Sequence, residues 1–137
     1  MPDAARLSSA VTFVRDLDRS VEFYTGVLPL AVADRSPTAA LLVSSEGAQL
    51  VLRAIGAHAP HPLGSVGVQY LIWLAGQDDT ARQTEQALRD RSALTGTRSS
   101  GDVTVVEGRD PDDIVVMIAH AGPGQLPLGL PPRIYGW

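Results

Sequence analysis

The sequence from Val11 to Leu28 reads VTFVRDLDRSVEFYTGVL, and it predicts a strand followed at once by a helix. β-Branched and aromatic residues fill Val11 to Val14, which is typical of a half-buried strand. Asp16 stands where a helix N-cap is expected, because its carboxylate can accept hydrogen bonds from free backbone amides. Apolar side chains then recur at helical spacing, at Leu17, Val21, Tyr24 and Leu28. We expect this helix to pack on its own sheet and to leave the other sheet face free.

The same order of elements is predicted twice along the chain, once in each half. The first half continues with strands expected at Ala31 to Arg35, Ala39 to Ser44 and Ala48 to Ile55. The second half predicts a strand at Val68 to Ala75, a helix at Thr80 to Arg91 capped by Asp78-Asp79, and strands at Ala93 to Arg98, Asp102 to Glu107 and Ile114 to His120. This repeat indicates an α+β fold of two βαβββ modules in a single domain, residues 1–137. Module one covers about 7–55, a linker 56–66, module two about 67–120, and a Pro- and Gly-rich tail 121–137.

Composition excludes several classes of protein. The chain has 137 residues, a net charge of −4 and no cysteine, so disulfides, thiolate metal sites and a cysteine nucleophile are excluded. The acidic balance argues against nucleic-acid binding, which needs clustered positive charge. No apolar run approaches the roughly 20 residues that a membrane span needs. The polar start at Met1-Pro2-Asp3 predicts no secretory signal, and we expect a cytoplasmic protein.

Two segments resemble the vicinal oxygen chelate superfamily, which includes glyoxalase I, extradiol dioxygenases and bleomycin-resistance proteins. They are VRDLDRSVEFYTGVL, residues 14–28, and EGRDPDDIVVMI, residues 107–118. The likeness covers about residues 7–120. It implies an open, curled mixed sheet around a cavity, with helices on the outer face, in a homodimer. In metal enzymes of the superfamily, each of four strands supplies one ligand, namely histidine on each module's first strand and glutamate or histidine on its last.

The resemblance assigns those four positions in this chain to Ser9, Val51, Gln69 and Met117. Serine and glutamine are weak neutral donors, valine is no ligand, and methionine suits only soft metals. The resemblance therefore implies the fold without its usual metal chemistry. We predict no metal and no other cofactor.

Strand alternation extends the predicted cavity lining beyond those four positions. The predicted ligand-binding residues are Ser9, Val11, Phe13, Gln49, Val51, Arg53, Gln69, Leu71, Trp73 and Met117, with Val115 and Ala119 on the same face and Tyr135 and Trp137 from the tail. An apolar lining with few polar groups is typical of a small-molecule pocket. The alternatives are that the apolar residues fill a closed core, that Arg53 lies at a rim, and that the tail is frayed.

The three histidines do not form a predicted site. His58 and His61 lie in the linker, and His120 has the opposite parity to Met117, so we expect it to face away from the cavity. We assign no catalytic residue on this basis.

Together these features predict a metal-independent protein that binds and sequesters an apolar or aromatic natural product, as in the bleomycin-resistance branch and in antibiotic self-resistance. The ligand would be a small molecule, and the partner a second copy of the chain. One alternative is a cofactor-free isomerase or cyclase of the same superfamily in a biosynthetic pathway. Another is a metal enzyme with relocated ligands.

Overall fold

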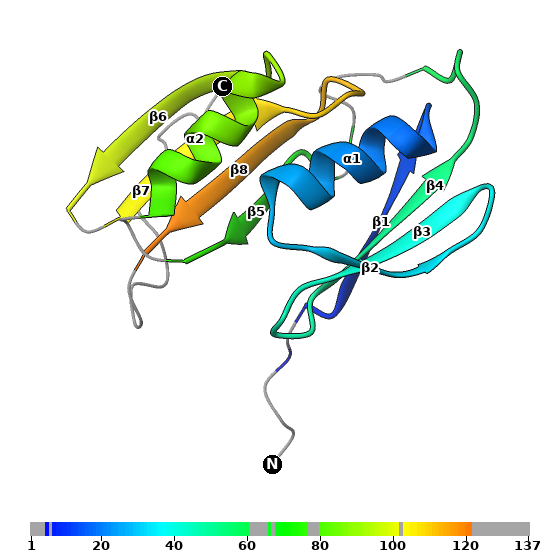
Figure 1. The fold of residues 1–137 in the computed structure, drawn as a ribbon, viewed down its shortest axis with the longest axis horizontal. Helices are drawn as coiled ribbons and strands as arrows, with labels where there is room; N and C mark the ends of the chain where they lie inside the picture. Colours follow the sequence, from blue (N-terminus) through cyan, green and yellow to red (C-terminus); the bar gives the residue numbers. More distant parts are fainter. Residues whose placement is uncertain are drawn as a thin grey trace. The chain divides into compact units, whose positions relative to one another are not determined.

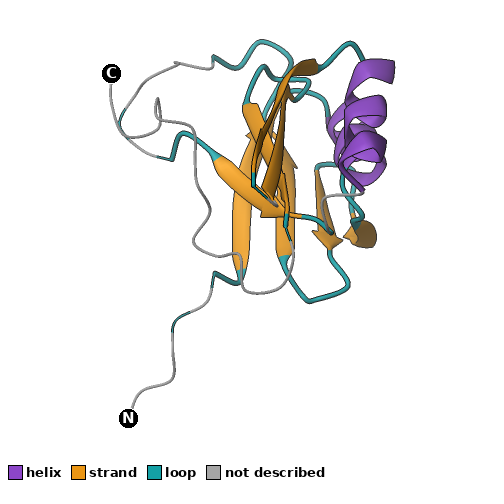
Figure 2. Ribbon diagram, turned by 90° about the vertical axis from the view of Figure 1, so that its left-hand side faces the viewer, coloured by secondary structure: helices purple, strands orange, loops and turns teal. Residues whose placement is uncertain are grey.

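The part of the chain that the structure describes forms two four-stranded mixed sheets and two α-helices, which confirms the predicted α+β class (Figure 1 and Figure 2). The computed structural model describes residues 5, 7–60, 66, 68–76, 80–101 and 103–121. The first half contains β1 (Ser9–Val14), α1 (Leu17–Val27), β2 (Ala31–Arg35), β3 (Ala39–Val43) and β4 (Gln49–Ala54). The second half contains β5 (Leu71–Leu74), α2 (Ala81–Asp90), β6 (Leu94–Ser100), β7 (Val103–Arg109) and β8 (Val115–His120). The order of elements is the one that the sequence predicts.

The elements form two compact units, and each unit contains two separate stretches of the chain. Unit 1 contains the residues up to 67 together with Asp110–Asp113, and unit 2 contains residues 68–109 and those from 114 onward. Asp110–Asp113 belongs to the turn that the sequence predicts between the last two strands, here β7 and β8. This turn packs with unit 1 although it joins two strands of unit 2.

The sheet of unit 1 has the strand order β1-β4-β3-β2, with β1 parallel to β4 and the other neighbours antiparallel. Helix α1 packs on β3 and β4. The buried side chains of this layer come from alternate positions of the strands and from one side of the helix, and they include Val14, Leu42, Leu50, Leu52, Val21 and Tyr24. Alternation along each strand leaves the remaining side chains on the opposite face of the sheet.

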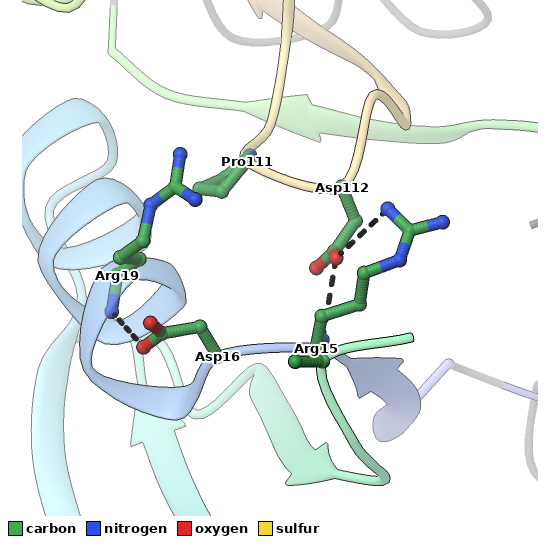
Figure 3. Close-up of a pocket in the computed structure, with 6 residues that line it drawn as sticks. Arg15, Asp16, Arg19, Pro111 and Asp112 are labelled. Atoms are coloured by element: carbon green, nitrogen blue, oxygen red, sulfur yellow. Dashed lines mark hydrogen bonds and ion pairs between the residues drawn. The ribbon is translucent and has the colours of Figure 1, made fainter. Parts of the chain in front are cut away.

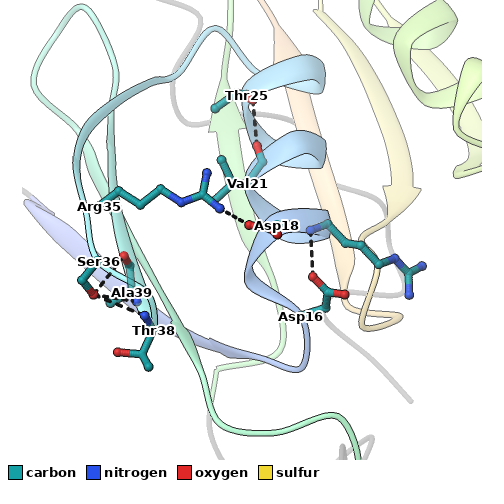
Figure 4. A network of polar contacts seen from close by, with 9 residues as sticks. Asp16, Asp18, Val21, Thr25, Arg35, Ser36, Thr38 and Ala39 are labelled. Carbon is teal, nitrogen blue, oxygen red and sulfur yellow. Dashed lines mark hydrogen bonds and ion pairs between the residues drawn. The ribbon is translucent and has the colours of Figure 1, made fainter.

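Two aspartates at the start of α1 make polar contacts that fix this end of the helix (Figure 4). The Asp16 carboxylate accepts a hydrogen bond from the backbone N–H of Arg19 at 3.1 Å, which confirms the predicted N-cap. Asp18 in the first turn forms an ion pair with Arg35 at the end of β2. The helix therefore begins at a residue that satisfies one of its free amides, and the ion pair links it to its own sheet.

Replacing Asp16 with alanine is expected to lower the free energy of unfolding by about 1 kcal/mol, because a free amide of α1 loses its acceptor. Asp16→Asn keeps an acceptor oxygen at the same place and is expected to change stability little. Chemical denaturation followed by circular dichroism measures both variants. Equal stabilities of the alanine and asparagine variants would contradict the capping role.

The sheet of unit 2 has the order β5-β8-β7-β6, with β5 parallel to β8. Helix α2 packs on β6, β7 and β8 through Ala81, Thr84 and Leu88, which are buried. The residue before α2 is Thr80, and its side chain makes no capping hydrogen bond. Asp78 and Asp79, which the sequence predicts as the cap, lie outside the described residues.

Candidate functional site

The open face of the unit 1 sheet brings together the predicted binding residues of the first half. Bridge partners in a sheet point to the same side, so each row of partners lies on one face. Three rows cross β1, β4 and β3 on the face away from α1. They are Ser9, Gln49 and Val43; Val11, Val51 and Leu41; and Phe13, Arg53 and Ala39.

This face is exposed and apolar at its edge strand. Val11 is 64% exposed and Phe13 is 55% exposed, whereas Leu50 and Leu52 on the other face of β4 are buried. Val11 and Phe13 are therefore not part of the core between this sheet and α1. Neighbouring exposed apolar side chains of this kind mark a surface that can take a ligand or a partner.

Polar groups lie at the two ends of this face. The Ser9 hydroxyl donates to Oε1 of Gln49 at 2.8 Å, so the amide nitrogen of Gln49 is the group left to donate to a ligand. At the other end lies Arg53, which is exposed and beside Phe13. Within the described part of the chain, the carboxylates in ion pairs bind Arg15 and Arg35, and none binds Arg53.

In unit 2, the sequence prediction assigns the residues of β5 to the wrong faces of the sheet, because its register is off by one residue. Leu71 pairs with Val116 and Trp73 pairs with Ile118, so neither shares a face with Met117. The face of Val116 is the one covered by α2, because its partner Gly108 lies against Leu88 of that helix. Trp73 and Leu71 therefore point to the helix side of the sheet. Residues 70–74 are apolar or aromatic at every position, so alternation does not specify which face is which, and a slip of one residue exchanges the faces.

The β5 residue that shares a face with Met117 is Ile72, because the two residues are bridge partners. Met117 is fully buried in a cluster with Val103, Val105, Ala119 and Ala121, and Tyr70 and Val115 pack against this cluster. The side chains of Met117 and Ala119 thus fill a core, which is the alternative that the sequence left open. Gln69 precedes β5 and is exposed. Tyr135 and Trp137 lie outside the described residues.

The register corrects the four positions at which metal enzymes of the superfamily would hold their ion. Val51 pairs with Val11, two residues after Ser9, and Met117 pairs with Ile72, two residues after Tyr70. Tyr70 is therefore the counterpart of Ser9, in place of Gln69. Ser9, Val51, Tyr70 and Met117 offer two neutral hydroxyls, a thioether and an alkyl group, which do not fit a divalent cation. In the described part of the chain, no group of three or more His, Asp or Glu side chains is placed to hold a metal ion.

His120 lies on the helix-covered face of unit 2, where Nδ1 is 2.8 Å from the Thr80 hydroxyl. It is buried and faces away from Met117, as its parity predicts. His58 is exposed in the linker, and His61 lies outside the described residues.

A pocket that the sequence does not predict lies at the start of α1 in unit 1 (Figure 3). It has a volume of about 250 Å³, and its lining residues are Arg15, Asp16, Arg19, Ala57, Pro111 and Asp112. The Asp112 carboxylate accepts from the backbone N–H of Arg15 at 3.2 Å and forms an ion pair with its guanidinium at 3.4 Å. Nε of Arg15 donates to the Ala59 carbonyl at 2.8 Å. Arg15 and Asp112 thus hold the turn of residues 110–113 on unit 1, whereas the Asp16 carboxylate caps α1.

A second, buried contact holds the same turn. The Tyr24 hydroxyl of α1 donates to Oδ2 of Asp110 at 2.6 Å, and Oδ1 of Asp110 accepts from the backbone N–H of Asp112 at 2.8 Å. Burial, and then the charge of Asp110 beside it, raises the pKa of the Tyr24 hydroxyl far above its ordinary value. Tyr24 therefore remains a proton donor to Asp110 at all ordinary pH values. No local sequence signal places Tyr24 next to a residue that lies 86 positions later.

Comparisons with known proteins match both the sequence and the fold. A profile described as "Glyoxalase/Bleomycin resistance protein/Dioxygenase superfamily" matches residues 6–118. No curated protein matches the chain.

Three of the similar solved structures illustrate the match. A glyoxylase/bleomycin resistance protein/dioxygenase domain from Frankia sp. EAN1pec has a TM-score of 0.74 and 23% identity, over 88% of this chain and 100% of that one. A lactoylglutathione lyase from Agrobacterium tumefaciens has a TM-score of 0.67 and 19% identity, over 95% and 100%. A fosfomycin resistance protein from Mesorhizobium loti has a TM-score of 0.66 and 11% identity, over 91% and 98%. At these identities the structures agree in fold. No helix of the described residues is long and apolar enough to cross a membrane.

Proposed function

Because the chain belongs to the glyoxalase/bleomycin resistance protein/dioxygenase superfamily, we propose that it binds a small apolar or aromatic molecule without a metal ion. The open face of the unit 1 sheet forms one wall of the predicted ligand cavity in this proposal. Sequestration of a natural product, as in self-resistance to an antibiotic, is the function that this kind of binding serves. A homodimer in the cytoplasm is part of the same proposal.

The observation that carries the proposal is the exposed apolar strip on β1. Val11 and Phe13 are 64% and 55% exposed, and they lie between polar groups at both ends of the face. Covering an exposed phenylalanine with a ligand removes apolar surface from water at about 25 cal/mol per Å². The Ser9–Gln49 pair and Arg53 can fix the orientation of that ligand, as a few polar groups do in small-molecule sites.

The corrected register supports the metal-independent part of the proposal. With Tyr70 assigned to the fourth position instead of Gln69, the four side chains still include no carboxylate and no imidazole. The enzyme alternative needs a titratable side chain beside the ligand. The three rows across β1, β4 and β3 contain no Asp, Glu or His, and the acidic side chain of this face, Asp34, lies on the edge strand β2, two strands away from β4.

Phe13→Ala is expected to weaken binding of a flat aromatic compound about tenfold, because the variant loses about 1.4 kcal/mol of apolar contact. Isothermal titration calorimetry against a panel of neutral and charged aromatic compounds measures this effect. Val32→Ala is the matched control, because Val32 is also exposed, at 45%, but pairs with buried Leu42 on the other side of the sheet.

Two outcomes would overturn the proposal. In one, no aromatic compound binds more tightly than about 100 μM, which is about −5.5 kcal/mol. In the other, Phe13→Ala and Val32→Ala weaken binding equally. Turnover of a bound compound would favour the enzyme alternative, and stoichiometric metal in the purified protein would favour relocated ligands.

A further inference from the structure

The geometry of the open face points to the chemical class of the ligand: an aromatic anion, whose acidic group pairs with Arg53 while its ring covers Phe13 and Val11. This inference rests on the proposed function and specifies it. It assigns to Arg53 the selection of anionic over neutral ligands of the same shape.

The first argument is the position of Arg53 in its row. Arg53 lies between Phe13 on β1 and Ala39 on β3, as bridge partner of both. Adjacent strands are about 4.8 Å apart, so the base of the Arg53 side chain lies beside the base of the Phe13 side chain and beside the Ala39 methyl group. The small side chain of Ala39 leaves room next to the guanidinium. A ring that covers Phe13 can therefore carry its acidic group directly towards Arg53.

The second argument is charge. The protein has a net charge of −4, and the open face carries two charged side chains, the cation Arg53 on β4 and Asp34 on the edge strand β2, which is the bridge partner of Leu41. The guanidinium groups of Arg15 and Arg35 are each in an ion pair with a carboxylate of the fold. Arg53 makes no such pair within the described residues, so its charge is left for a ligand. A cationic ligand that covers Phe13 would be repelled by the adjacent Arg53, since Asp34 lies two strands away from β4.

The third argument is the distance between the two polar ends. Gln49 and Arg53 are four residues apart on one strand, which corresponds to about 13 Å. The row between them, Val11, Val51 and Leu41, is apolar throughout. A molecule with an acidic group at one end, two or three fused rings, and a hydrogen-bond acceptor at the other end matches this order. The Gln49 amide nitrogen, left free by the Ser9 bond to its oxygen, would donate to that acceptor.

Arginine is suited to this task because its planar guanidinium binds a carboxylate or sulfonate through two parallel hydrogen bonds and stacks on aromatic faces. An exposed ion pair in water contributes only modestly to the binding free energy, and dissolved salt screens it. The expected preference for an anionic over a neutral ligand is therefore about tenfold at low salt, and it shrinks as salt is added.

The test compares three probes of one shape: 2-naphthoate, neutral 2-naphthamide and cationic 2-naphthylmethylammonium. Calorimetry of the full chain is expected to rank them in that order, with 2-naphthoate about tenfold tighter than 2-naphthamide. Arg53→Gln is expected to remove this preference and to leave 2-naphthamide binding unchanged. Arg53→Lys, which keeps the charge but loses the planar fork, is expected to retain part of it.

Arg82→Gln is the matched control, since Arg82 is an exposed arginine on α2 of the other unit. It changes the net charge equally and is expected to keep the full preference. Equal affinities of the wild-type protein for 2-naphthoate and 2-naphthamide would overturn the role of Arg53 while leaving the proposed function intact. The same holds if Arg82→Gln removes the preference as completely as Arg53→Gln. Failure of all three probes to bind would instead count against the proposed function itself.

Discussion

Replacing Gly108 with alanine is expected to lower the free energy of unfolding of unit 2 by about 2–3 kcal/mol. An alanine Cβ at this position would lie 2.6 Å from the Ala93 carbonyl oxygen and 2.7 Å from a methyl group of Leu88. The Leu88 side chain can rotate, but the carbonyl is backbone and accepts a hydrogen bond from the N–H of Arg109 at 2.9 Å. The variant must therefore move α2 and the following turn away from β7, or break that bond.

Gly96→Ala is the matched control for this prediction. Gly96 lies in β6 of the same sheet, and an added Cβ would meet nothing within 4 Å. This variant is expected to change stability by less than about 1 kcal/mol, and in the stabilising direction if the unfolded chain loses freedom. Chemical denaturation followed by tryptophan fluorescence, to which Trp73 on β5 contributes, measures both. Equal effects of the two substitutions would show that the close approach of α2 to β7 is not needed.

Tyr24→Phe is expected to destabilise unit 1 by about 2 kcal/mol, because the buried carboxylate of Asp110 loses its 2.6 Å donor. The turn of residues 110–113 is then held by the Arg15–Asp112 ion pair and by backbone contacts. We expect the backbone amides of Asp112 and Asp113 to exchange with solvent faster in this variant, since both donate to Asp110. Circular dichroism during denaturation and amide hydrogen exchange measure the two effects.

Tyr70→Phe removes the same hydroxyl from a half-buried tyrosine of unit 2 and is expected to cost less than about 0.5 kcal/mol. If Tyr24→Phe is no more harmful than Tyr70→Phe, the Tyr24–Asp110 bond does not anchor the turn.

The contribution of Tyr24 to the free energy of unfolding is also expected to decrease at alkaline pH. Its folded-state pKa is raised above the unfolded value near 10. Below pH 10 both states keep the proton and the full stability is present. Above pH 10 the unfolded chain releases this proton while the folded chain keeps it, so stability falls by up to about 1.4 kcal/mol per pH unit. The stability difference between the wild-type protein and Tyr24→Phe is therefore expected to shrink above pH 10. A constant difference up to pH 11.5 would contradict the raised pKa.

Which residues of β1 and β4 share a face could be predicted from strand alternation. The structure pairs Ser9 with Gln49 and Phe13 with Arg53 on the open face, as the sequence predicts, and their role in binding stays a prediction. The N-cap at Asp16 was predictable for a similar reason, since the capping bond is local. In β5 the same method failed, because every residue from Tyr70 to Leu74 can be buried on either face.

The sequence by itself determined the repeated order of strands and helices and the absence of cysteine. These follow from residue types and short-range periodicity. Only the tertiary structure decided that Trp73 faces α2, that Tyr70 is the counterpart of Ser9, and that Asp110 and Asp112 pack on α1. The physical reason is that helix packing selects the face of a uniformly apolar strand, and that contacts between residues nearly a hundred positions apart leave no periodic trace in the chain.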